Sequence, residues 1–251
     1  MAYGLRVSST PPSTIPEVIE RLRALEAAGP RGDGVACFAH LYREVTESVR
    51  SDLDTHRVAD ASFLERLDVA FAGLFFSALE AYERDPGSAP RAWVPLFAGR
   101  SSRGVAPLQF ALAGMNAHIN RDLPVALVTT CGELGVGLGD ASPEHGAFER
   151  VDLLLAQVET RVKRTYVTGW LAWLDRLVHR LHRLDDVVAM WDVDRARDAA
   201  WTNGQALWAL RGEPPLADAF LLALDRIVGL ASRGLLIPAD SVLRRLARLV
   251  D

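Results

Sequence analysis

The 251-residue sequence has little cysteine, almost no lysine and no long apolar run. Two cysteines, Cys37 and Cys131, are too few for a disulfide framework, and they form no CxxC pair of the kind that binds structural zinc. No apolar stretch approaches the roughly 18 residues that a membrane-spanning helix needs. The N-terminus also lacks the apolar segment of a signal peptide. We therefore expect a cytoplasmic protein without a membrane span.

Of the 28 basic residues, Lys163 is the only lysine, a bias that a GC-rich coding sequence produces. The formal net charge of -4 does not favour nucleic acid as a partner. A hydrophobic content of 49% excludes intrinsic disorder and allows a large core. Two catalytic signatures are also missing: the chain has no Gly-x-Ser-x-Gly elbow and no glycine loop that ends in Lys-Ser or Lys-Thr.

What the chain does contain is helical periodicity. A Ser or Thr cap before Pro16 opens the first helix, and Gly29-Pro30 ends it. No segment clearly alternates like a strand, and residues 124–128 are the one ambiguous run. The predicted helices span residues 16–28, 35–51, 60–84, 107–122, 147–184, 187–210, 215–233 and 239–250.

Two long connections interrupt these helices, at residues 85–107 and 132–146. The first contains Trp93, Leu96 and Phe97, which we expect to pack against the core. There is no internal repeat and no flexible linker. The sequence thus predicts an all-α, single-domain orthogonal or up-down bundle of eight or nine helices with two long ordered loops. We expect an N-terminal arm at 1–16 and one helical domain at 17–251.

The densest polar cluster in an apolar setting surrounds His118. His118 and Asp122 lie four residues apart on one helical face, and Asn116 and Asn120 lie on the adjacent face. Polar groups on a buried face must form a network or line a cavity, because burying them without partners costs several kcal/mol. Pro124 cannot donate a hydrogen bond to the carbonyl of Asn120, so we expect the helix to kink or restart there.

A histidine held by a carboxylate is a general acid or base whose tautomer and pKa depend on its neighbour. The same pair could instead supply two metal ligands, completed by a second i, i+4 pair, His40 and Glu44. A purely structural interpretation also exists. In that case the polar side chains satisfy backbone groups at the kink, and Asp122 caps the following helix.

A second cluster lies within residues 190–208. Arg197 and Trp201 share a helical face, so the indole could stack on the guanidinium while Asp194 or Asp198 fixes it. This arrangement suits an anionic ligand. The alternative is an intrahelical ion-pair ladder in which the tryptophans belong to the core.

The run Asn-Ala-His-Ile-Asn-x-Asp-Leu-Pro at 116–124 resembles the signature of an actinobacteria-rich family of helical proteins of unknown function. Residues 191–201 give a second match, and Leu41–Thr46, which includes Tyr42, gives a third. The resemblance spans about 15–235 and implies a helical fold with a motif centred on His118. The chain is also loosely similar to zinc-dependent phospholipase C and nuclease bundles, although it has only part of their run of His and Asp ligands.

These features lead to three functional hypotheses. The first is a small-molecule enzyme of bacterial specialised metabolism, without a redox cofactor, that catalyses cyclisation, elimination or hydrolysis on an anionic substrate. The second is a metal-dependent hydrolase with His118, Asp122, His40 and Glu44 as ligands. The third is a non-catalytic ligand-binding or scaffold protein, and the sequence leaves open whether the protein forms a homodimer. In the first hypothesis, His118 transfers the proton and Asp122 orients the imidazole of His118. The substrate-binding residues are then Asn116, Asn120, Arg197, Trp201 and Tyr42.

Overall fold

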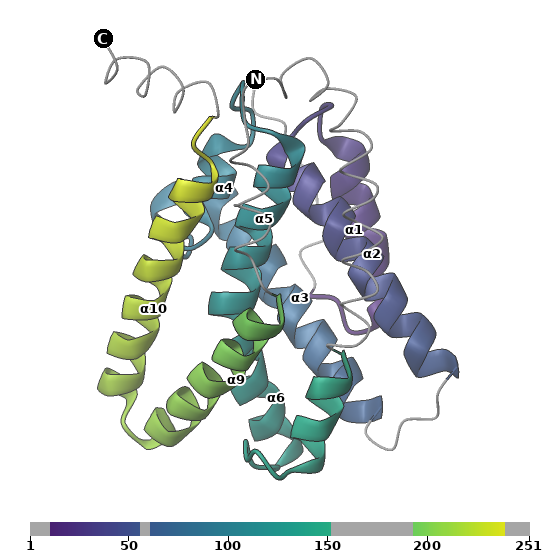
Figure 1. Ribbon diagram of the computed structural model, residues 1–251, viewed down its shortest axis with the longest axis vertical. Helices are drawn as coiled ribbons and strands as arrows, with labels where there is room; N and C mark the ends of the chain where they lie inside the picture. Colours follow the sequence, from purple (N-terminus) through teal and green to yellow (C-terminus); the bar gives the residue numbers. More distant parts are fainter. Residues whose placement is uncertain (1–10, 56–60, 152–192, 239–251) are drawn as a thin grey trace.

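A computed structural model describes residues 11–55, 61–151 and 193–238, and these residues form a helical bundle without strands (Figure 1). The all-α fold class is therefore confirmed, and the ambiguous run 124–128 is helical. No helix within the described ranges is long and apolar enough to cross a membrane. The main helices are α1 (Ile15–Ala28), α2 (Gly34–Thr55), α3 (Ala61–Arg84), α4 (Val94–Gly99), α5 (Pro107–Ala117), α6 (Leu123–Leu134), α9 (Val193–Ala209) and α10 (Pro214–Leu235).

The ends of the N-terminal helices follow from local chemistry. Thr14 caps α1 by accepting a hydrogen bond from the amide of Glu17, and Gly29 ends the helix, as predicted. Asp33 opens α2, since its Oδ1 accepts from the amides of Val35 and Ala36, each at 3.0 Å. The first turns of both helices are thus set by side chains that come directly before them.

The first long connection has the predicted length but contains helical turns, and the second is shorter than predicted. Residues 85–107 contain a 3₁₀ turn, Pro86–Ser88, and the short helix α4. Trp93, Leu96 and Phe97 are almost fully buried, which confirms that this stretch packs against the core. The second connection starts only at Gly135, a left-handed cap with φ 66°, and the chain is helical again from residue 143. Beyond residue 151, the helix predicted at 147–184 lies outside the described residues, as do the start of the one at 187–210 and the one at 239–250.

Helix α5 is the central element and lies between α10 on one side and α1 and α2 on the other (Figure 1). It packs tightly on α2, where a Cβ atom on Gly114 would overlap the ring of Phe38. Phe38, Phe75 and Trp93 pack ring against ring beside it. This aromatic core surrounds the end of α5, where the His118 motif begins.

Candidate functional site

The His118 motif forms a single π-helical turn, His118–Asp122, that joins α5 to α6. The amide of Leu123 donates to the carbonyl of His118, five residues earlier, and Pro124 sits in the first turn of α6. The wider turn accommodates a proline that has no N–H to donate. The interruption expected at Pro124 is therefore a π turn within one continuous helical path. Asp122 makes no side-chain cap to α6, contrary to the structural interpretation.

Asp122 instead orients His118. Its side chain is fully buried, and Oδ2 lies 3.2 Å from Nδ1 of His118. Oδ2 also accepts from the indole N–H of Trp93 at 2.9 Å, while Oδ1 accepts from the guanidinium of Arg121 at 2.7 Å. An ionised carboxylate can only accept, so Nδ1 of His118 carries a proton toward it. Nε2 of His118 then holds the lone pair.

Aromatic rings enclose the imidazole. The ring of Phe71 stacks on His118 with centroids 3.4 Å apart, and Tyr42 meets it edge-on at 4.5 Å. His118 is only 1% exposed. This burial lowers the pKa of His118 below its usual 6.5, although the carboxylate of Asp122 acts in the opposite direction. At neutral pH the imidazole is therefore neutral and able to accept a proton at Nε2.

Nε2 of His118 makes no hydrogen bond to any described residue, and His118 lines a cavity of about 60 Å³. Tyr42, Asp68 and Arg197 line the same cavity. Tyr42 and Arg197 were predicted to bind substrate, and the structure places both in the lining of the cavity that His118 lines. The remaining walls are apolar: Val45, Val49, Leu64, Leu67, Phe71, Met115, Ile119, Leu123 and Val151.

Asp68 is the cavity residue that the sequence analysis missed. It lies on α3, and its Oδ2 atom is inaccessible and without a hydrogen bond. Burial raises the pKa of Asp68 from 3.8 to about 7. Burial also raises the pKa of Tyr42 well above 10, helped by the nearby carboxylate of Asp68. A signal for Asp68 existed, since it shares the apolar face of α3 with Leu64 and Phe71 at helical spacing.

Arg197 reaches the cavity from α9 and is 6% exposed. One terminal nitrogen donates to the carbonyl of Phe148 at 2.9 Å, and the guanidinium lies 4.0 Å from the centre of that ring. The guanidinium of Arg197 thus stacks on Phe148, and not on Trp201 as expected. Trp201 packs against the ring of Phe148 and donates its indole N–H to Asp140. It does not belong to the cavity lining. Asp198 is exposed.

Asn116 and Asn120 do not line the cavity. Asn116 donates to the carbonyl of Val228 at 3.1 Å and to the hydroxyl of Ser232 at 2.9 Å, both on α10. Asn120 donates to the side-chain oxygen of Asn116 at 3.1 Å. Asn116 therefore connects the central helix to α10 and is itself bound by Asn120, and the structure does not bring the two amides into the cavity lining as substrate anchors.

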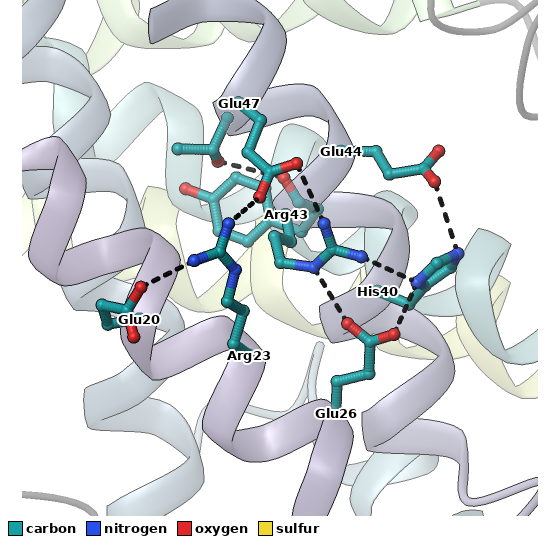
Figure 2. Close-up of polar contacts among 9 residues, drawn as sticks. Glu20, Arg23, Glu26, His40, Arg43, Glu44 and Glu47 are labelled. Carbon is teal, nitrogen blue, oxygen red and sulfur yellow. Dashed lines mark hydrogen bonds and ion pairs between the residues drawn. The ribbon is translucent and has the colours of Figure 1, made fainter.

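His40 and Glu44 lie away from the cavity, in a network of charged side chains between α1 and α2 (Figure 2). Nδ1 of His40 is 2.8 Å from Glu26, its Nε2 is 3.5 Å from Glu44, and Arg43 bridges Glu26 and Glu47. His40 precedes Tyr42 by two residues, or about 200° around α2. The four proposed metal ligands therefore do not converge. Within the described part of the chain, no group of three or more His, Cys, Asp or Glu residues could hold a metal.

Comparisons with known proteins identify the family to which the chain belongs. No curated protein and no solved structure matches the chain, so the looser likeness to zinc-dependent bundles gains no support. A family model, in contrast, matches residues 15–238, close to the span expected from the motifs. The chain therefore belongs to the family of unknown function designated DUF5995.

Proposed function

We propose that this protein is a small-molecule enzyme of bacterial specialised metabolism that works by proton transfer at His118. One observation carries the proposal. His118 is buried, its Nδ1 faces the Asp122 carboxylate at 3.2 Å, and its Nε2 is unpartnered at a small cavity. An oriented neutral imidazole with an available lone pair is a general base, and it returns the proton as a general acid.

The surrounding residues support this role by fixing its geometry. Trp93 and Arg121 hold the two oxygens of Asp122, so the carboxylate keeps the imidazole in one tautomer and stabilises the imidazolium once it forms. The positive charge of Arg197 on the same cavity favours an anionic substrate or leaving group. The apolar walls accept a carbon skeleton and keep bulk water out.

The reaction class follows from the side chains at the cavity. The described lining contains no serine, threonine or cysteine that could act as a nucleophile. Proton transfer by His118 is sufficient for an intramolecular cyclisation, an elimination or the activation of water for hydrolysis. None of these reactions requires a redox cofactor.

The test is to incubate the protein with a bacterial small-metabolite extract in D2O and to follow the mixture by mass spectrometry. The wild type should deplete or deuterate at least one anionic metabolite. His118→Asn should abolish this change, because its amide still donates toward Asp122 but no longer offers a base. His40→Asn, which lies outside the cavity lining in the charged network between α1 and α2, is the matched control and should behave like the wild type. Equal conversion by His118→Asn, or none by the wild type, would contradict the proposal.

A further inference from the structure

Three of the residues that line the His118 cavity each have a buried side-chain polar atom that makes no hydrogen bond to a described residue: the hydroxyl of Tyr42, Oδ2 of Asp68 and Nε2 of His118. They come from α2, α3 and the π turn, so three separate elements contribute to one place. A buried polar atom that makes no hydrogen bond has a free-energy cost, and most such atoms in proteins are satisfied. A cavity lined by three of them is therefore suited to a polar group of a ligand.

The donors and acceptors at the cavity specify that group. Nε2 of His118 carries a lone pair, so it needs a donor from the ligand. The phenol of Tyr42 is kept protonated because its pKa is raised, so it can donate to the ligand. A single ligand atom that donates to one side chain and accepts from another is a hydroxyl oxygen. A methyl group of the same size would leave all three buried atoms without partners.

The size and the walls of the cavity limit the rest of the ligand. A water-sized site takes roughly 10–15 Å³ of such volume, so a cavity of about 60 Å³ suits about four to six non-hydrogen atoms. Val45, Val49 and Leu64 belong to an aliphatic wall that suits a short carbon chain. Arg197 lines the same cavity, and a guanidinium is the side chain best suited to pair with a carboxylate.

We propose that the cavity binds a short aliphatic hydroxy acid. Its hydroxyl donates to His118 and accepts from Tyr42 and from the protonated form of Asp68, and its carboxylate lies toward Arg197. The inference rests on the proposed function in one respect: it places the substrate hydroxyl at the atom that would accept a proton. Binding is nevertheless measurable without any turnover.

The experiment compares two probes of equal size, lactate and 2-methylpropanoate, which differ by a hydroxyl in place of a methyl group. Each is titrated into the full chain by calorimetry, and the ring nitrogens of His118 are followed by 15N NMR. Both enantiomers of lactate are used. We expect one enantiomer to bind at least about tenfold more tightly than 2-methylpropanoate. The methyl group of 2-methylpropanoate would leave the buried polar atoms of the cavity residues without hydrogen bonds, which weakens its binding. The Nε2 resonance of His118 should shift on binding.

Tyr42→Phe is the decisive variant, because it removes a single hydroxyl and keeps the aromatic ring that packs in the core. It should reduce the preference for lactate several-fold, whereas Tyr82→Phe, a half-buried tyrosine outside the cavity lining, should leave it unchanged. Equal or tighter binding of 2-methylpropanoate, no binding of either probe, or an unchanged preference in Tyr42→Phe would overturn the inference. Turnover of a metabolite without a hydroxyl, dependent on His118, would leave the proposed function standing while this inference failed.

Discussion

His118 and Asp68 line one cavity, and burial shifts their pKa values in opposite directions. The imidazole titrates below its usual 6.5, and the carboxyl titrates at about 7 instead of 3.8. Both shifts favour the uncharged form, because the surroundings of each side chain are apolar. Near neutral pH the cavity therefore combines a neutral base with a carboxyl group that is partly protonated. Pairs of this kind are typical of sites that move protons.

The raised pKa of Asp68 makes folding stability depend on pH. The folded state binds more protons than the unfolded state between pH 3.8 and about 7, so stability falls as the pH rises through this window. At about 1.4 kcal/mol per pKa unit, reduced for partial solvent access, the loss is on the order of 2–4 kcal/mol. Asp68→Asn should remove it. Urea unfolding at pH 5 and pH 8 measures the difference, with the exposed Asp54→Asn as a control. Parallel pH profiles for wild type and Asp68→Asn would contradict the assignment.

The tautomer of His118 gives a second test. With Asp122 ionised, 15N NMR should show a protonated Nδ1 and a bare Nε2, and the pKa of His118 should lie below 6.5. Asp122→Asn removes the charge that favours the imidazolium, so we expect the pKa of His118 to fall further. We also expect part of the population to move to the other tautomer. An unchanged 15N spectrum in Asp122→Asn would show that Asp122 does not orient the ring.

Among the helices, the path from α5 through the π turn to α6 decides where the site lies. The extra residue in the π turn places His118 and Asp122 over the aromatic core, while Asn116 faces α10. This path is held by close helix contacts. A Cβ atom on Gly229 of α10 would lie 2.6 Å from the backbone carbonyl oxygen of Arg91. This oxygen can move away only if the backbone that leads into α4 moves with it.

Replacement of Gly229 by alanine should therefore destabilise the protein by about 1–3 kcal/mol, because the backbone must shift to relieve the overlap. Gly73→Ala, in α3, is the matched control. Nothing lies within 4 Å of the Cβ it would add, so alanine should stabilise the helix by about 0.5–1 kcal/mol. Chemical unfolding of both variants measures the two effects. If Gly229→Ala were as stable as Gly73→Ala, α10 would not approach Arg91 as closely as described.

Helical spacing in the sequence was enough to predict α1, α2 and α3 to within a few residues, because proline, glycine and capping side chains mark their ends. The spacing also indicated that His118 and Asp122 share a buried face. It could not show which helix covers that face, since such contacts join residues far apart in the chain. For this reason Asn116 was assigned to the substrate although it binds α10, and Asp68 was overlooked on a helix that was interpreted only as part of the core.

At the scale of the whole molecule, Asp225 connects the C-terminal helix α10 to the site. Its carboxylate accepts from the amides of Arg91 and Ala92, at 2.7 and 3.0 Å, more than 130 residues earlier in the chain. It also lies 3.7 Å from Nε of Arg121, whose guanidinium donates to Asp122. A chain of charged groups thus runs from α10 through Arg121 and Asp122 to His118.

Asp225→Ala should affect both the fold and the site. The variant leaves two backbone amides without their acceptor and loses a charge beside Arg121, so we expect a loss of about 2–4 kcal/mol in the free energy of unfolding. Because Asp122 is then the one carboxylate among the described residues that holds Arg121, the 15N resonances of His118 should shift as well. Asp218→Ala, an exposed position on the same helix, should change neither quantity. If Asp225→Ala were destabilised but its His118 spectrum were unaltered, Asp225 would join α10 to Arg91 and Ala92 without acting on the site.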